Sequence, residues 1–461
     1  MLETANTTDT FLVSQTSSKL KESSARLLDA VHTPMVARDP HEKHRASTPL
    51  ELLFDLTMVV AVAVVSAEFD HYILDGGNVG TGVLRFVFSF LSIWIAWLNY
   101  VWFASGYDSD DVLFRLGTLG QMIGVLVLGN GIPNIFKKFD VTQSTYGYVI
   151  MRFFHIFFFR LRAAYQHPET TVQNLKHAGL TLLLQAGWIG RLYLPQTDAW
   201  VIGTVAGLGV SELLLPFLAE SGTSAYAAYH AHHISERYGL FTIIVLGEVI
   251  LSVSNATRFS YDGKSLNAET VKIGLGGMII VFSLWWIYFL IPFGDLLTKH
   301  STRGFLWGYG HIGIHAPVAS LAAGLAIIVQ ASILPEINKS VSRRAEASTA
   351  GSETKSSSSS AINATDIRKT GIMIVAISTA IFIASLNSLL LVLTKFRWKS
   401  FLPKIATSAV LILIGAFCPG AGGLSAGDVV LLLCVPVLGL LLYCIGQVGV
   451  KSDIFELART D

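Results

Sequence analysis

Charged residues are scarce in this chain of 461 residues. Asp, Glu, Lys and Arg together make up 14% of the sequence, whereas soluble globular proteins carry about 25%. Hydrophobic residues, in contrast, reach 52%. A chain of this size with so few charged side chains cannot cover a water-exposed surface with polar groups. The composition therefore excludes an ordinary soluble protein.

An excess of either charge is absent as well. The 33 basic residues nearly balance the 32 acidic ones, which leaves a net charge of +1. A nucleic-acid-binding protein needs a clustered basic face, so we expect no nucleic-acid partner. Cysteine is also rare: Cys418, Cys434 and Cys444 lie in apolar stretches without the spacing of a metal or redox site. We interpret them as packing residues and expect no cofactor.

Long apolar runs are what the chain has instead. Crossing a bilayer takes roughly 17 to 25 apolar residues, and runs of this length recur from residue 50 onward. The sequence predicts an all-α, polytopic membrane protein with about twelve transmembrane helices, with the lipid bilayer as its main partner. The predicted spans are 50–70, 84–104, 114–135, 145–165, 175–194, 199–218, 237–256, 271–293, 306–331, 370–394, 401–418 and 428–449.

Three polar segments flank or interrupt these spans. Residues 1–49 are rich in Ser and Thr and hold no apolar run long enough for a signal-peptide core, so they are predicted to form a disordered cytosolic tail. The segment 335–369 contains a serine run at 356–360 and is predicted to be a disordered loop. Residues 450–461 are predicted to form a cytosolic C-terminal tail.

The loops also predict how the chain is oriented. Lys and Arg are more numerous in the loops on the side of the N-terminus, which by the positive-inside rule puts that terminus in the cytosol. Three N-glycosylation patterns, starting at Asn255, Asn338 and Asn363, fall in loops on the opposite side. We therefore expect a glycoprotein of the plasma membrane or an endomembrane.

Two stretches of sequence are similar to each other. Aligning Glu51 with Glu236 also aligns Thr57 with Thr242, and the next predicted helix in each case carries tryptophan pairs before an acidic loop. The likeness predicts two related halves, 50–219 and 220–449, of six helices each. Because six is even, both halves would have the same orientation in the membrane.

A few carboxylates occur where an ionisable side chain is costly. Glu51 and Asp55 are four residues apart, so both lie on one face of a helix. They either form part of a site or favour a helix start that follows Ser47, Thr48 and Pro49.

Glu248 lies near the middle of the seventh predicted helix and must be protonated or paired. We predict a functional carboxylate there, with a neutral structural hydrogen bond as the alternative. Arg152 is deep enough in its span to neutralise a carboxylate, whereas Arg160 and Arg162 are expected to reach the cytosolic interface.

Histidines with helical spacing offer two candidate metal sites. His232 and His233 lie four and three residues before Glu236, next to Arg237. His311 and His315 form a second pair, four residues apart. Such pairs can hold zinc together with an acidic ligand. The alternative is interfacial histidines in the first group and packed, hydrogen-bonded histidines in the second.

Two of these stretches resemble a known family. Residues 49–56, Pro-Leu-Glu-Leu-Leu-Phe-Asp-Leu, and residues 233–248, which run from His233 to Glu248, are similar to the low-temperature-requirement A family of membrane proteins. The resemblance implies a multi-spanning membrane protein and no particular substrate. The positions carried over from the family pattern are Glu51, Phe54, Asp55, His233, Glu236, Arg237, Gly239, Gly247 and Glu248.

The leading functional hypothesis is a transporter of a small molecule or ion. In it, Glu51, Asp55, His233 and Glu236 line the cytosolic mouth of a central cavity, and Glu248 binds a proton or cation at mid-depth. One alternative is an intramembrane metal-dependent enzyme that uses His311 and His315 on a lipid or another apolar substrate. Another is a membrane scaffold or stress-tolerance factor without turnover.

Overall fold

Helices make up the architecture of the computed structural model, and no strand occurs in the part of the chain it describes. The described residues are 33–37, 39, 42, 45–107, 109–195, 197–220, 229–259, 267–348, 364–394, 398–420 and 423–449. The two predicted tails therefore lie largely or wholly outside them.

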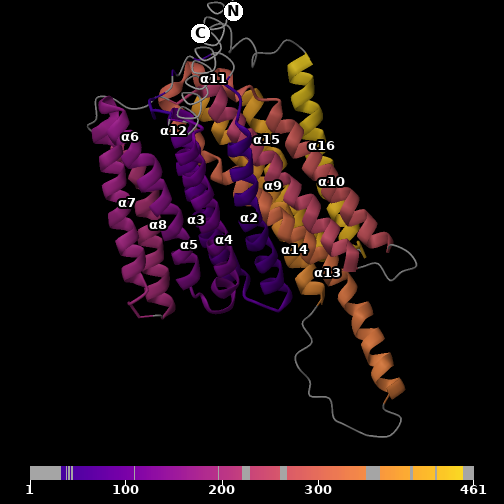
Figure 1. The fold of residues 1–461 in the computed structure, drawn as a ribbon. Coiled ribbons are helices and arrows are strands. Elements are labelled where there is room, and N and C mark those ends of the chain that lie inside the picture. Colours follow the sequence, from indigo (N-terminus) through magenta and orange to yellow (C-terminus); the bar gives the residue numbers. More distant parts are fainter. Residues whose placement is uncertain are drawn as a thin grey trace, which may run out of the picture.

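The helices fall into two groups along the chain (Figure 1). The first helix group consists of α2 (Pro49–Leu74), α3 (Val79–Tyr107), α4 (Val112–Lys138), α5 (Thr142–Phe154), the π-helical turn η1 (His155–Arg160), α6 (Leu161–Gln166), the 3-10 turn η2 (Pro168–Thr170), α7 (Thr171–Arg191) and α8 (Asp198–Glu220). The second helix group consists of α9 (Ala231–Phe259), α10 (Ala268–Phe289), α11 (Phe293–Lys299), η3 (Ser301–Arg303), α12 (Gly304–Gly310), α13 (Ile312–Ser348), α14 (Ala364–Leu393), α15 (Trp398–Phe417), η4 (Cys418–Gly420) and α16 (Ala426–Gly449).

Ten helices in the described part are long and apolar enough to cross a membrane, compared with about twelve predicted spans. The predicted spans 145–165 and 175–194 correspond to helical segments that do not qualify. In the first, the α-helix gives way to the π-helical turn η1. In the second, α7 carries buried polar residues such as Gln173 and His177. Both segments carry polar side chains that are buried against other helices, and these side chains lower the mean hydropathy of the segments.

The first span begins as the sequence predicts. Thr48 caps α2 by accepting a hydrogen bond from the backbone N–H of Glu51, and the Glu51 side chain accepts one from the backbone N–H of Thr48. This reciprocal arrangement is a capping box, and Pro49 occupies the first helical position that suits proline. The cap fixes the start of α2 and so positions Glu51 and Asp55.

The two groups of helices share one packing feature. In the first group α4 and α5 meet at Gly124 and Gly147, where a Cβ on either glycine would lie 2.6–2.8 Å from the carbonyl oxygen of the other. In the second, α13 and α14 meet at Gly324 and Gly371, where the corresponding distances are 3.1–3.2 Å. Small residues allow membrane helices to pack with their backbones in near contact. Each helix group is thus built around one close helix pair.

The segment 335–369 is more helical than the sequence predicts. Helix α13 continues to Ser348 and α14 begins at Ala364, because Ala, Glu, Lys and Arg sustain a helix beyond the apolar core. Of the three glycosylation positions, Asn255 is exposed near the end of α9, Asn338 falls on the α13 backbone, and Asn363 lies outside the described residues.

Candidate functional site

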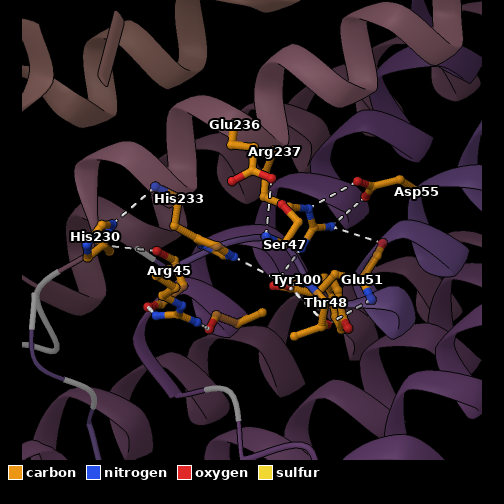
Figure 2. Close-up of polar contacts among 12 residues, drawn as sticks. Arg45, Ser47, Thr48, Glu51, Asp55, Tyr100, His230, His233, Glu236 and Arg237 are labelled. Carbon is orange, nitrogen blue, oxygen red and sulfur yellow. Dashed lines mark hydrogen bonds and ion pairs between the residues drawn. The ribbon is translucent and has the colours of Figure 1, made fainter. Parts of the chain in front are cut away.

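Four predicted site residues meet at the contact between α2 and α9, where the two helix groups join (Figure 2). Glu51 and Asp55 share one face of α2, and His233 and Arg237 share the facing side of α9. Arg237 Nη1 lies 2.7 Å from Glu51 Oε1, and Arg237 Nη2 lies 2.6 Å from Asp55 Oδ1. His233 Nε2 lies 3.2 Å from Glu51 Oε2. All four side chains are completely buried. We call them the carboxylate cluster.

Further donors hold both carboxylates in place. Trp97 Nε1 donates to Asp55 Oδ1 over 2.8 Å, and Arg237 Nε donates to Asp55 Oδ2 over 3.1 Å. The backbone N–H of Thr48 donates to Glu51 Oε2 over 2.8 Å. A buried ion pair is tolerated only when its oxygens and protons have such partners. The carboxylate cluster therefore joins the two helix groups without leaving a bare carboxylate.

The carboxylate cluster holds two carboxylates, Glu51 and Asp55, and one guanidinium, Arg237. Buried Arg45 lies next to the cluster and acts electrostatically on His233. His233 donates from Nε2 to Glu51, while its Nδ1 has no hydrogen-bond partner in the described structure. Nδ1 of His233 is therefore the nitrogen of the carboxylate cluster that could accept a proton without breaking a hydrogen bond of the described structure.

A cavity of about 1010 Å³ lies beside the carboxylate cluster, between the two helix groups at the end of the bundle where α2 and α9 begin. We call it the end cavity. Its walls come from α3, the η1 turn, α7, α8, the start of α9, α11, η3 and α12. Its volume is that of a site for a small molecule.

Two side chains connect the end cavity to the carboxylate cluster. His230 lines the cavity, and its Nδ1 accepts a hydrogen bond from the backbone N–H of His233 over 3.1 Å. Arg45 also lines the cavity and donates to the carbonyls of Ala104 and Ser105 at the end of α3. Figure 2 shows Arg45 and His230 next to His233. One layer of side chains thus separates the cavity from the carboxylate cluster.

The remaining predicted carboxylates lie apart from this centre. Glu236 is exposed, and its Oε1 accepts a hydrogen bond from the backbone N–H of Ser47 over 3.3 Å. Glu248 is buried further along α9, where Ser252 on the same helix donates to its Oε1 over 3.0 Å. No ion pair of Glu248 occurs in the described part of the chain. Glu248 is therefore not a member of the carboxylate cluster.

His311 and His315 are both completely buried, and their hydrogen bonds fix them as neutral rings. Trp94 donates to Nδ1 of His315 over 3.1 Å, so the proton of His315 is on Nε2, which contacts Thr242 Oγ1 over 3.1 Å. His311 Nδ1 donates to the Trp307 carbonyl over 2.9 Å, and its Nε2 accepts from Tyr288 over 3.0 Å.

All four ring nitrogens of this pair are therefore in use. Among the described residues, no three His, Cys, Asp or Glu side chains gather as a metal ion would require. His232 instead lies 3.6 Å from Asp295, with both side chains more than half exposed. The geometry favours packed, hydrogen-bonded histidines over a zinc site.

The sequence did not identify the partners of the buried arginines in the first helix group. Arg152 pairs with Glu212 over 2.8 Å, a carboxylate that sequence alone could not assign to it. Arg160 and Arg162, which the sequence predicts at the cytosolic interface, are both buried against other parts of the protein. Arg162 pairs with Asp111, whereas Arg160 lines the end cavity. In the sequence these arginines follow an apolar run, which is typical of side chains that extend to the membrane surface. The end cavity forms only in the tertiary structure and could not be seen in the sequence.

The sequence comparisons agree with this architecture. The family model described as Bacterial low temperature requirement A protein (LtrA) matches residues 46–441, which is most of the chain. The chain is also similar to an uncharacterized protein of Rhizobium meliloti (strain 1021). The two are 23% identical over 305 residues, which cover 64% of this chain and 72% of that protein.

Proposed function

The chain belongs to the low temperature requirement A family, and we propose that it is a transporter that couples movement of a small solute to one proton exchanged at the carboxylate cluster. The observation that carries the proposal is a fully buried site in which two carboxylates, Glu51 and Asp55, meet Arg237. The same site holds a histidine, His233, whose Nδ1 has no hydrogen-bond partner in the described structure. Ionisable groups inside a membrane protein are by default sites of ion or substrate handling.

The position of the end cavity supports this proposal. It lies between the two helix groups and is separated from the carboxylate cluster only by Arg45 and His230. Substrate sites in many transporters lie at the interface of two structural repeats. With the N-terminus in the cytosol, as the loop charges predict, this cavity would receive its solute from the cytosol.

We further propose that the two helix groups are related halves. In both, two consecutive long helical segments pack through a glycine pair: α4 on α5 through Gly124 and Gly147, and α13 on α14 through Gly324 and Gly371. In both, the first helix also contacts the third, α2 with α4 and α9 with α13. The first helices, α2 and α9, are those that the carboxylate cluster joins. A proton that changes this link would act directly on the contact between the halves.

Proton exchange can alter that contact through charge alone. With His233 neutral, Arg237 is shared between Glu51 and Asp55. A proton on His233 Nδ1 would make the ring a cation that competes with Arg237 for Glu51. A weaker attachment of Arg237 to α2 would let the halves move relative to each other, as alternating access requires.

Glu248 remains a predicted second site on the same helix. Its carboxylate has a hydroxyl partner, Ser252, and no cation in the described part of the chain. A buried carboxylate with such a partner can hold a proton or a small cation. Its role is separable from that of the carboxylate cluster by mutation.

The test uses the full-length protein in vesicles that contain the pH indicator pyranine. A deproteinised cell extract, which supplies small solutes, is added outside under an imposed pH gradient. We expect a change in internal pH that requires the protein and is abolished by Glu51→Gln. The matched control is Glu236→Gln, which removes an exposed carboxylate of α9 that lies outside the carboxylate cluster. Vesicles with this variant should show the same change in internal pH as the wild type.

Two results would count against the proposal. If wild-type vesicles respond like protein-free vesicles, the protein does not couple a solute to protons. If Glu51→Gln folds and keeps full flux, the carboxylate cluster is a static clamp between α2 and α9.

A further inference from the structure

Arg160 differs from two other buried arginines of the first helix group, Arg152 and Arg162. Arg152 pairs with Glu212 and Arg162 pairs with Asp111. Arg160 is buried to the same degree, yet its hydrogen bonds go to His155 Nε2 over 3.2 Å and Asn174 Oδ1 over 3.2 Å. Neither partner carries a negative charge. A buried guanidinium that forms no ion pair is costly. This one lines the end cavity together with Glu220, which acts on it electrostatically.

The backbone is specialised at this arginine. Residues His155–Arg160 form a π-helical turn between α5 and α6. A π turn inserts an extra residue into a helix and occurs frequently at functional sites. Here it brings residues five apart to one side, so that Arg160 Nε can donate to His155. The guanidinium is therefore oriented by His155 of its own turn and by Asn174 of α7, both neutral acceptors.

Neighbouring groups on α7 have unused hydrogen-bonding capacity. Gln173 and His177 both line the end cavity and are more than nine-tenths buried. Gln173 Oε1 and His177 Nε2 have no hydrogen-bond partner in the described structure. Buried polar atoms without partners are rare in native proteins and call for an explanation. A polar ligand in the cavity would supply one.

Aromatic side chains form much of the remaining wall of the end cavity. Arg160 lies over the Phe103 ring at 5.0 Å. The aromatic side chains of the wall are Trp102, Phe103, Tyr107, Tyr229, Phe305 and Tyr309. The wall also carries a second arginine, Arg45, whose guanidinium donates to backbone carbonyls, and two carboxylates, Glu42 and Glu220. A guanidinium beside aromatic rings suits a ligand that has an anionic group on an apolar body.

We propose that the end cavity binds an organic anion, with Arg160 holding its carboxylate or phosphate group and the aromatic walls contacting its apolar part. This names the substrate class of the transport function proposed above, on which it rests. The fork of the guanidinium matches the paired oxygens of either anion. Glu220 also lines the cavity and acts electrostatically on Arg160 without forming an ion pair with it. Its charge should therefore weaken the binding of an anion.

Binding is measured on the full-length protein in detergent by isothermal titration calorimetry. The anionic probes are phenyl phosphate and benzoate, and benzyl alcohol and benzylamine are the neutral and cationic counterparts. We expect the anions to bind more tightly than either counterpart. Arg160→Met should weaken phenyl phosphate binding about tenfold or more, Arg160→Lys less, and Glu220→Gln should strengthen it. The matched control is Arg115→Met, which removes a largely exposed arginine and should change nothing.

A parallel arm distinguishes a free anion from a lipid headgroup. The protein is placed in nanodiscs of phosphatidylcholine with or without phosphatidic acid, and phenyl phosphate binding is measured again. Competition by phosphatidic acid identifies a lipid as the source, and its absence identifies a free solute. The proposal is overturned if benzyl alcohol binds as tightly as the anions, or if both Arg160 variants bind phenyl phosphate normally.

The result is separable from the transport proposal. Anion binding without proton-coupled flux would leave this inference standing and contradict the transporter. If the wild type binds no anion and a folded Arg160→Met variant keeps its flux, the transporter proposal stands and this inference is contradicted.

Discussion

Two completely buried regions of this protein look alike in the sequence and differ in the structure. The carboxylate cluster on α2 and α9 and the histidine pair His311 and His315 both rest on residues four apart. In the first, each charged side chain meets an opposite charge across a helix contact, and His233 Nδ1 stays without a partner. In the second, neutral donors and acceptors occupy every ring nitrogen. Equal spacing therefore gives a charged link in one place and a neutral packing unit in the other.

Removing the shared cation should produce the largest effect. Arg237→Met leaves Glu51 and Asp55 buried side by side without a counter-charge, which we expect to cost about 3–5 kcal/mol of stability. Thermal unfolding in detergent measures this loss. Adding Glu51→Gln and Asp55→Asn should restore part of it, because the neutral side chains no longer need the guanidinium. A loss below about 1 kcal/mol in the single variant would show that charge does not hold α2 to α9.

Much of the carboxylate cluster could be predicted, because its signals are local. The sequence around Thr48 and Pro49 predicted the start of α2, and the capping box confirms it. The spacing of Glu51 and Asp55 predicted a shared face. What sequence could not supply was the partner helix, since the residues that meet Glu51 are about 180 positions away.

The wall of the end cavity could not be predicted for a related reason. Arg160 in an apolar run looks like an interfacial arginine, and only the packing of α7 and α3 encloses it. Buried polarity also explains why two of the predicted spans, 145–165 and 175–194, are less apolar than a membrane-crossing helix. The π-helical turn before Arg160 has no signature in the sequence that we could recognise.

Substitution of a residue in the histidine pair should cause the second-largest loss of stability. His315→Phe removes the acceptor for Trp94 Nε1 and the donor to Thr242, which leaves the buried Trp94 N–H without a partner and Thr242 with only its hydrogen bond to the Tyr238 carbonyl. We expect a loss of about 2–3 kcal/mol, less than for Arg237→Met because no charge is uncovered. The same unfolding assay measures it, with chelator present or absent. A chelator effect on the wild type would contradict the neutral packing role and restore the metal hypothesis.

An ion pair outside the spans tests whether the contrast between charged and neutral regions holds elsewhere. Burial acts to raise the pKa of Asp111. Hydrogen bonds from Arg162 and from the backbone N–H groups of Phe114 and Thr33 act in the opposite direction and outweigh burial, so the pKa lies below its usual value. A carboxyl with a lowered folded pKa contributes stability above its unfolded pKa of about 3.9 and loses it as the pH falls through the folded value.

For this pair we expect Asp111→Asn to cost about 1–2 kcal/mol at neutral pH. The difference from wild type should shrink below about pH 4. Unfolding temperatures measured from pH 7 down to pH 3 follow the difference. If the gap stays constant across that range, the carboxylate charge of Asp111 does not contribute to stability.

Glu248 should give the smallest change in stability and so separates folding from function most clearly. In Glu248→Gln the amide oxygen can still accept the hydrogen bond from Ser252, so we expect a cost of about 1 kcal/mol or less. Because Glu248 has no cationic partner in the described structure, the substitution uncovers no charge, unlike Arg237→Met.

Proton-coupled flux in vesicles is then the informative measurement, with Ser252→Ala as the control that removes the donor and keeps the carboxylate. Loss of flux in Glu248→Gln with unchanged unfolding would make Glu248 a second proton or cation site on α9. Retained flux would leave the carboxylate cluster as the coupling centre and make Glu248 a neutral, hydrogen-bonded residue like the histidine pair.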